Sequence, residues 1–450
     1  MNKPLKTTIY KLAPAVLISL VATSLGLLSL FKSKVPMIQD FGMMLTIGIV
    51  IAFLLALFVL LPILVVRTKL SDKSDKLVTK KATSKYFLVM KKFTKGVLKF
   101  KYVIIIVAFI LAGIGFFFDQ KVGVETDMET FMPQDSEALA DIHELRDLVG
   151  STDAIVLMYQ SDEIDSYATI FEVKTISDML NTEYSDSIVR LGSVTTMLDM
   201  LSNSAWNEAN FETFYNQLPS EQLALLQSSE ENIGIINVSL ANMDDAEFVQ
   251  FLDDLSVSLD NLDMNMEITV TGQSIVEQEM LVAMTSDRLI ISLISIALVF
   301  GALLLIYRNL FKALIAILPI VFIIGWSGGI MYLLGFDYTP LTSTIGALII
   351  GIGTEFTILI LMRYYELKKE TGNHLESISD AIGHMSKPII VSGITTIGGF
   401  SALVFSDFQI LSNFGIMTLI NISLALISSI VVLPALLGIL GKSAKVVASN

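Results

Sequence analysis

"GALIIGIGTEFTILILM", residues 346–362, is an apolar run that holds one carboxylate, Glu355, among glycines and threonines. Such a run is long enough to cross the hydrocarbon core of a bilayer. A charge near the bilayer centre costs roughly 2.5 to 3.5 kcal/mol, so a residue of this kind faces the interior of a helix bundle or a water-filled cavity. The stretch therefore predicts a membrane protein in which Glu355 has either a packing role or a functional one.

The composition supports a membrane protein and excludes several kinds of chemistry. Hydrophobic residues make up 53% of the 450 residues and charged residues only 16%, which is unlike a water-soluble domain. The chain has no cysteine, and its three histidines form no HxxxH pair, so neither a thiolate nor a histidine-pair metal site is expected. It also lacks a GxxxxGK[ST] phosphate loop. We expect no cofactor, no metal, no ATP-driven step, no enzymatic activity and no nucleic-acid partner.

Apolar stretches of transmembrane length predict a polytopic α-helical membrane protein of about eight spans. These stretches are 12–31, 41–66, 102–118, 289–307, 313–335, 341–362, 388–405 and 414–441. Counted as domains, they give two helices in 1–66, one in 102–118, three in 288–364 and two in 387–441. Between them lie a basic linker (67–101), a long insertion (119–287) and an amphipathic connector (365–386), with a short tail at 442–450.

The distribution of basic residues predicts the orientation of the bundle. The linker 67–101 carries twelve Lys/Arg against two Asp, and basic residues near helix ends stay on the cytoplasmic side. Three further sets of basic residues, at 308–312, 363–369 and 442–445, fall on the same side of the membrane if each span crosses it once. Both termini are therefore expected in the cytoplasm of a cell with this protein in its cytoplasmic membrane.

The insertion 119–287 is then expected outside the cell. It carries 34 acidic residues against four basic ones, a formal charge of −30. A charge of this kind favours a solvated, self-repelling surface over an acidic substrate funnel, and it argues against anionic partners. Its apolar periodicity predicts the order β-α-β-β-α-β with a helical excursion at 197–230, which is a ferredoxin-like α+β domain. Trp206 and Phe211 are expected to pack that excursion.

Two helix pairs in the chain repeat one another. A shift of 373 residues aligns small, polar and aromatic positions, and a slip of one residue later aligns two prolines. Repeats of this length indicate duplicated structural units. The chain is therefore expected to open with the last two helices of a unit whose six-helix version follows. The aligned pairs are Ser19/Ser392, Thr23/Thr396, Gly26/Gly399, Ser33/Ser406, Phe41/Phe414, Gly42/Gly415, Met44/Met417 and Pro62/Pro434.

Four motifs, together with this order of helices, resemble the resistance-nodulation-division (RND) superfamily, in its MMPL-like or hydrophobe/amphiphile exporter branch. "VETDMETFMPQDSEAL" (124–139) resembles the segment after the first helix of a half, and "VTGQSIVEQEM" (270–280) the exit from the external domain. "GIGTEFTILILMRYYE" (351–366) is similar to the branch's G-x-G-x-D-Y helix. "SGITTIGGFSALVFSDFQILSNFGI" (392–416) is similar to its penultimate helix and the following turn.

The resemblance implies a transporter, driven by the proton gradient, of lipids and other hydrophobic or amphiphilic molecules. Glu355 and Phe356 stand where the family usually has Asp and Tyr, and the first four helices and first external domain have no counterpart. The chain is thus similar to the C-terminal part of a two-half transporter, so the expected partner is a first-half polypeptide or, in a homo-oligomer, a second copy. The alternative is a membrane scaffold or binding protein that kept the fold without transport.

Glu355 is the predicted proton-coupling residue, and interhelical packing is the alternative. Ala347, Gly351 and Glu355 are spaced at four residues and so share one helical stripe, which a neighbouring helix can approach closely. Gly353 is a further close-packing position. Thr354, Thr395 and Thr396 are the predicted hydroxyl partners, for relay or for packing.

Overall fold

The computed structural model of the chain describes residues 3–63, 66, 85–125, 131–149, 154–241, 243, 245–262 and 264–440. It divides into a helical unit, 1–125 with 283–450, and an α+β unit, 126–282. In the part of the chain so described, seven helices are long and apolar enough to cross a membrane. They are Pro36–Ile63, Lys101–Asp119, Arg288–Tyr307, Leu310–Leu334, Ile345–Thr371, His374–Val404 and Gln409–Leu440. The chain is a multi-pass membrane protein.

The first predicted span, 12–31, lies in helix α1 (Lys3–Leu28), followed by the turn η1 (Ser29–Lys32). Its described apolar part, Val16–Lys32, is shorter than a full membrane span. An eighth crossing at this position stays a prediction.

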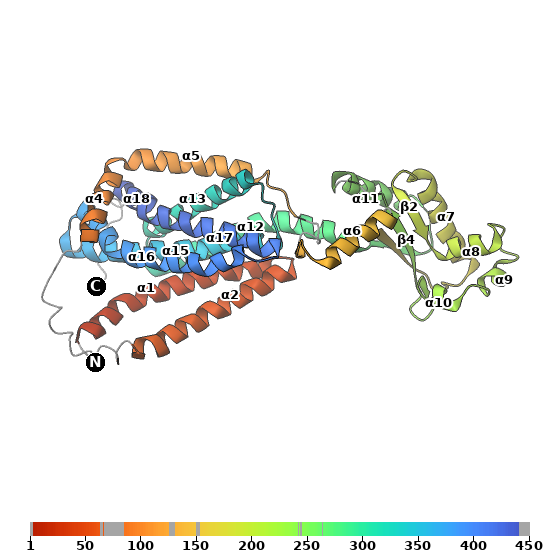
Figure 1. Ribbon diagram of the computed structural model, residues 1–450, viewed down its shortest axis with the longest axis horizontal. Helices are drawn as coiled ribbons and strands as arrows, with labels where there is room; N and C mark the ends of the chain where they lie inside the picture. The colour runs from red at the N-terminus through yellow and green to blue at the C-terminus, as the bar shows by residue number, and fades with distance from the viewer. Residues whose placement is uncertain are drawn as a thin grey trace. The chain divides into compact units, whose positions relative to one another are not determined.

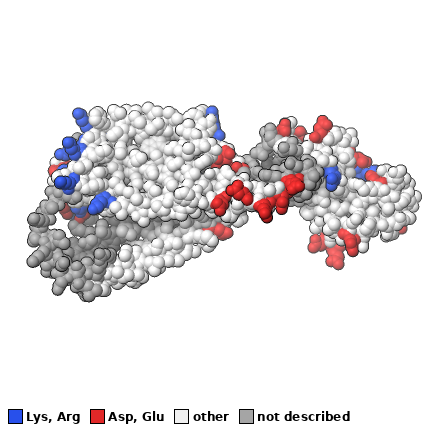
Figure 2. Space-filling model, viewed as in Figure 1, with Lys and Arg blue, Asp and Glu red and all other residues white. Residues whose placement is uncertain are grey.

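The helical unit has two helices at its centre (Figure 1). In α13 and α15, two thirds of the apolar window is buried, whereas no residue of the apolar window in the span Pro36–Ile63 is buried. Apolar side chains cover the sides of the unit, and Lys and Arg gather at the end where α4 lies (Figure 2). Apolar sides and a basic end are expected of a helical unit that is surrounded by lipid. The helices are α2 (Pro36–Leu55), α4 (Lys85–Lys99), α5 (Lys101–Asp119), α12 (Gln273–Tyr307), α13 (Leu310–Leu334), α14 (Pro340–Ser343), α15 (Ile345–Thr371), α16 (His374–Val404), α17 (Gln409–Ile427) and α18 (Leu433–Leu440).

Glycines bring α5 and α13 into backbone contact. A Cβ added at Gly325 would lie 2.6 Å from the carbonyl oxygen of Ala112, and one at Gly329 would lie 2.8 Å from the Cα of Gly115. Trp326 Nε1 donates a hydrogen bond of 3.2 Å to the carbonyl of Ala108. Helices in lipid associate through such close approaches of small residues, so the "GWSGG" stretch fixes α13 against α5.

The two repeated helix pairs have the same local structure. A π-helical turn follows α2 at Ala56–Leu60 (η2), and another follows α17 at Ser428–Val432 (η5). In each pair the glycine leaves no room for a Cβ, which would lie 2.7 Å from Leu30 Cβ at Gly42 and 2.9 Å from Leu403 Cβ at Gly415. Because Leu30 and Leu403 are themselves equivalent positions, the repeat extends from sequence to packing.

The helices on the α4 side continue past the predicted membrane boundaries. α15 runs to Thr371 and α16 begins at His374, so most of the predicted connector 365–386 is helical. The break falls at Gly372, whose φ of +68° suits glycine, and at Asn373, whose side chain caps α16 by accepting from the Glu376 N–H.

Helix α4 packs on this end of α16. Lys91 Nζ lies 2.6 Å from Asp380 and 3.4 Å from Glu376, and Tyr86 donates to Ser386. The hydrogen bond to Asp380 raises the pKa of the Lys91 ammonium. The remainder of the predicted linker, 67–84, and the tail 442–450 lie outside the described residues.

The α+β unit contains one antiparallel sheet. Its strands lie in the order β2-β4-β1-β5, with the short β3 on the edge of β4. Along the chain the order is β1 (Ala154–Gln160), α7 (Tyr167–Glu183), β2 (Ile188–Gly192), β3 (Gln227–Ser228), β4 (Ile233–Leu240), α11 (Asp245–Asp260) and β5 (Glu267–Thr271), after α6 (Glu137–Val149). The alternation of buried and partly buried residues along β1 and β4 sets their register, in which Leu157 pairs with Ile236.

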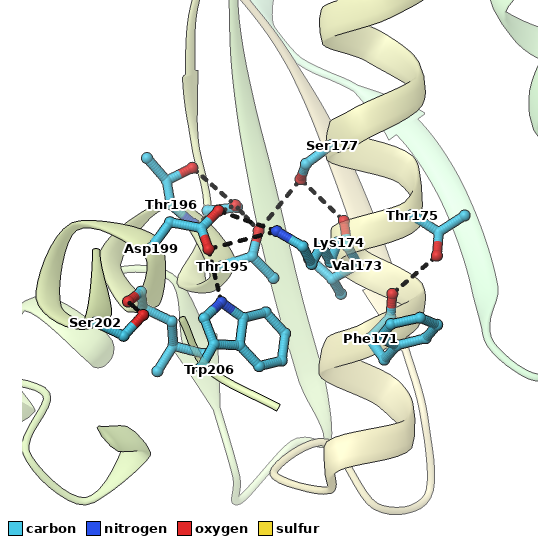
Figure 3. Close-up of polar contacts among 12 residues, drawn as sticks. Phe171, Val173, Lys174, Thr175, Ser177, Thr195, Thr196, Asp199, Ser202 and Trp206 are labelled. Carbon is cyan, nitrogen blue, oxygen red and sulfur yellow. Dashed lines mark hydrogen bonds and ion pairs between the residues drawn. The ribbon is translucent and has the colours of Figure 1, made fainter. Parts of the chain in front are cut away.

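The excursion between β2 and β3 forms helices α8 (Val194–Ser202), α9 (Phe211–Tyr215) and α10 (Ser220–Leu223), with a small core of its own. Trp206 and Phe211 are buried in that core, as expected. Figure 3 shows how it is held to α7: Asp199 accepts from Trp206 Nε1 at 2.7 Å and pairs with Lys174 at 3.2 Å. Lys174 also lies over the Trp206 ring, 5.4 Å from its centroid.

Replacing Asp199 should loosen the excursion, because Asp199→Ala removes the acceptor of Trp206 and the partner of Lys174 at once. We expect the free energy of unfolding of this unit to fall by about 1–2 kcal/mol. Urea unfolding followed by Trp206 fluorescence in a Trp326→Phe background measures it. Asp178→Ala, an exposed position on α7, is the matched control, and equal unfolding midpoints for the two variants would contradict the assignment.

Candidate membrane site around Glu355

Helix α15 carries Glu355 through the centre of the helical unit. Its start is fixed by α14, where Thr339 and Thr342 form a reciprocal capping box. Helices α1, α13, α16 and α17 all pack against α15. A carboxyl group on this helix is therefore placed among helices of both repeated pairs, since α1 belongs to the first pair and α16 and α17 to the second.

The structure brings α1 onto the predicted small-residue stripe of α15. Thr23 Oγ1 donates to the carbonyl of Gly351 at 3.1 Å, and a Cβ on Gly351 would lie 2.8 Å from Thr23 Cγ2. One turn away, a Cβ on Gly26 would lie 3.6 Å from the carbonyl of Ala347. The two helices thus run antiparallel. Gly353 lies on another side of α15, where its Cβ position is 3.3 Å from Ile320 of α13.

Glu355 follows Gly351 by one turn on the side that α1 approaches. The antiparallel register places Ser19, which is 6% exposed, level with it. Glu355 is partly buried, and among the described residues no hydrogen bond or ion pair reaches its carboxyl group. In an apolar span, such an acid has no fixed partner for its charged form among the described residues.

The three predicted hydroxyl partners bond to their own helices. Thr354 donates to the carbonyls of Ile350 and Gly351. On α16, Thr395 donates to Val391 at 2.8 Å and Thr396 to Ser392 at 3.0 Å, with both hydroxyls on an exposed part of the helix. Their part in a relay to Glu355 stays a prediction.

A second polar group lies between α15 and α17, and it was not predicted from the sequence. Asn421 is 4% exposed, and neither its amide nitrogen nor its amide oxygen has a partner among the described residues; the Thr418 hydroxyl is likewise buried without one. Both line a small cavity together with Ile345, Leu348, Ile349 and Ile352 of α15. Unpaired amides are costly in an apolar interior, and an Asn inside the predicted span 414–441 was the available signal.

A charged cluster at the far end of the helical unit from α4 was also missed. Asp119 ends α5, Arg288 begins the apolar span of α12, and Tyr338 lies between α13 and α14. Arg288 donates to Asp119 at 2.7 Å and to Tyr338 at 2.7 Å, and Tyr338 donates to Asp119 at 2.5 Å. The Arg288 guanidinium also lies 4.0 Å from the Tyr338 ring centroid. The cluster therefore ties the end of α5 and the loop after α13 to the middle of α12.

This cluster is buried rather than interfacial. Asp119 is 7% exposed at its side chain and Arg288 14%, and burial raises the pKa of the Tyr338 hydroxyl, so it stays a donor. Asp337, the residue just before Tyr338, lies against Gly123. Ends of apolar runs commonly carry charge, which is why Asp119 and Arg288 gave no distinctive signal. Together with Tyr338 and hydroxyls such as Ser327 and Thr342, they line a small cavity of about 30 Å³.

The family to which these helices belong follows from comparison with known proteins. The model of the MMPL family matches residues 143–450, which include all the strands β1 to β5 of the α+β unit and every helix from α12 onward. The chain belongs to the MMPL family. Its members fall within the RND-like exporters, as the resemblance implied.

Relatives of this MMPL-family chain differ in length. A putative membrane protein of Methanocaldococcus jannaschii is 23% identical over 346 residues, a match that covers 74% of this chain and 88% of that protein. The probable transport protein MmpL12 of Mycobacterium tuberculosis is 26% identical over 144 residues, 31% of this chain and 13% of that one. The apo-petrobactin exporter of Bacillus anthracis is 27% identical over 159 residues, 33% of this chain and 21% of that one.

Among solved structures, SecDF of Thermus thermophilus, a translocon-associated membrane protein, has a similar fold. Its TM-score is 0.53 at 15% identity, and the similarity covers 96% of this chain but 49% of SecDF. The chain thus spans about half the length of that structure and a smaller part of the MmpL proteins.

Breaking the Asp119–Arg288 pair should destabilise the helical unit. Arg288→Leu leaves the Asp119 carboxylate buried without its partner, which costs about 3–5 kcal/mol, whereas Tyr338→Phe removes one hydroxyl and costs about 1 kcal/mol. Thermal unfolding in detergent measures both. The double variant Asp119→Leu/Arg288→Leu should recover most of the stability. A loss of stability equal to the sum of the losses in Asp119→Leu and Arg288→Leu, each measured alone, would contradict a paired cluster.

Proposed function

We propose that this MMPL-family protein is a proton-driven exporter of hydrophobic or amphiphilic molecules such as lipids, and that Glu355 carries the proton. The observation behind the proposal is the placement of Glu355: it is the carboxyl group within the apolar run 346–362 of the central helix, and it has no bonded partner among the described residues. A group whose ionisation is used in a cycle must be able to gain and lose its proton, which a permanent ion pair would oppose.

The surroundings of α15 suit a coupled movement. The α1 contact includes close approaches at small residues and a hydrogen bond from one hydroxyl, Thr23, so protonation of Glu355, one turn from this contact, would alter how the two helices pack. The named relatives include probable transport proteins and an exporter. Because the chain matches only part of their length, an export function of the whole assembly belongs to the proposal. No bond chemistry and no enzymatic activity is part of it.

The α+β unit has a place in the same proposal as an external, ferredoxin-like porter domain. Its two β-α-β halves and its strand order β2-β4-β1-β5 support that description. Its acidity favours a position outside the cytoplasmic membrane, with the basic α4 end of the helices in the cytoplasm.

Substitution of Glu355 tests the coupling. Glu355→Gln keeps size and hydrogen bonding but cannot titrate, so protonophore-sensitive export of a dansyl-labelled phosphatidylethanolamine probe from host cells should fall at least tenfold. Glu355→Asp restores the usual acid of the family and should retain transport. Glu370→Gln, exposed in the last turn of the same helix, is the matched control. Export by Glu355→Gln at the wild-type rate, with equal protein in the membrane, would assign Glu355 to packing.

Single cysteines test the orientation, because the native chain has none. Lys95 is exposed on α4, and Glu208 is exposed on the excursion of the α+β unit. In intact cells an impermeant maleimide should label Glu208→Cys and leave Lys95→Cys unlabelled until the membrane is permeabilised. The reverse pattern would place the α+β unit in the cytoplasm and exclude its role as an external domain.

A further inference from the structure

A buried polar pair on α17 lies against the central helix. Thr418 and Asn421 are three residues apart and therefore share one side of α17. Their exposed fractions are 1% and 4%. The Thr418 hydroxyl and both the nitrogen and the oxygen of the Asn421 amide have no hydrogen-bond partner among the described residues. Burial of such groups without a hydrogen bond is costly, so the pair calls for a ligand that completes their bonding.

The two side chains line a cavity between α15 and α17, which we call the α17 cavity and whose other walls are apolar. The space open to the centre of a water molecule is about 10 Å³, and a buried water needs roughly 10–15 Å³ and two or more polar partners. Water can donate to the amide oxygen and accept from the amide nitrogen or the hydroxyl. A metal cation would use only the oxygen atoms and would leave the amide hydrogens unpaired. The α17 cavity therefore fits one neutral water molecule.

The cavity lined by Arg288 and its partners, which we call the cluster cavity, adjoins the α17 cavity. Ile345 and Ile349, one turn apart on α15, line both. The cluster cavity offers about 30 Å³ to the centre of a water molecule, and it is lined by Ser343, whose buried hydroxyl also has no partner among the described residues. Two sites that suit water thus share a wall made of two isoleucines.

Glu355 continues the stripe of α15 that lines the α17 cavity. Leu348 and Ile352 line that cavity, and Glu355 follows them at spacings of four and three residues, which keeps all three on one side of the helix. Along α15 the cluster cavity meets residues 345–349, the α17 cavity meets residues 345–352, and Glu355 comes next. The α17 cavity therefore lies between the charged cluster and Glu355.

We propose that Thr418 and Asn421 bind a water molecule in the α17 cavity, and that this water is the polar step between the cluster cavity and Glu355. The water site itself depends on the unpaired buried groups, whereas its part in proton movement rests on the proposed function. A proton reaches a buried acid through hydrogen-bonded side chains or water, because apolar side chains alone offer it no acceptor. Asn421 is thus a positioning residue, which acts on Glu355 through the water that it holds.

Hydroxyl-radical footprinting in H₂¹⁸O tests the water site without any transport, because X-rays split bound water and the radicals oxidise the nearest side chains. In the purified full chain in nanodiscs, ¹⁸O should enter Leu348 and Ile352 beside the α17 cavity and Met331 beside the cluster cavity. Ile358 and Ile360 of α15 are the matched controls. Both are fully buried and line neither of the two cavities, so they should stay unlabelled.

Two substitutions separate water binding from packing. Asn421→Leu keeps the size of the side chain and removes its polar atoms, whereas Asn421→Ser is smaller and keeps a hydroxyl that can bond to water. A water site predicts that Asn421→Leu lowers both the ¹⁸O labelling of Leu348 and Ile352 and the export of the lipid probe at least tenfold, while Asn421→Ser retains both. A packing role predicts the reverse order, since only Asn421→Ser leaves a hole. Ser423→Ala, which removes a hydroxyl bonded to Leu419 of its own helix, is the control and should change neither.

The water site is overturned if Leu348 and Ile352 take up no ¹⁸O in the wild-type chain, or if Asn421→Leu is labelled as strongly as the wild type. The polar step to Glu355 is overturned if the site is labelled but Asn421→Leu exports the probe at the wild-type rate. A failure of the proposed function gives a different pattern, in which Glu355→Gln itself leaves export unchanged while the ¹⁸O labelling still decides the water site.

Discussion

Close backbone approach at small residues is the constraint that holds the helical unit together. Helices surrounded by lipid gain little from exchanging apolar contacts with acyl chains for apolar contacts with each other, so their association depends on fit and on hydrogen bonds between helices. The α5–α13 contact at Gly325 and Gly329 and the α1–α15 contact at Gly351 both follow this rule. The position of Glu355 depends on this rule, because glycines on α15 allow the neighbouring helices to pack closely around it.

The sequence predicts the elements well where one physical rule dominates. Long apolar runs predict the spans, and the α15 stripe of Ala347 and Gly351 does meet a neighbouring helix, although the sequence could not say that this helix would be α1. Sequence periodicity also places the strands and helices of the α+β unit. It did not reveal that the connector 365–386 continues the two flanking helices, with a break only at Gly372 and Asn373.

The polar groups of the membrane site were harder to foresee. Asp119, Arg288 and Tyr338 are separated by 50 residues or more, and each alone resembles an ordinary boundary residue. Their relation becomes visible only when the end of α5, the middle of α12 and the loop after α13 come together in the fold. Asn421 gave a local signal, yet its relation to α15 depends on how α17 crosses that helix. Pairwise geometry of this kind is not encoded in the periodicity of either helix.

The Asp119–Arg288–Tyr338 cluster also has a mechanical consequence. The chain leaves the helical unit after α5 and re-enters it through α12, so these are the two covalent connections to residues 126–282. Asp119 and Arg288 stand at those two connections and bind each other, while Tyr338 adds the end of α13. The two connecting helices are therefore bound to each other and to the loop after α13 within the helical unit. A shift of any one of these elements acts on the other two through the same three side chains.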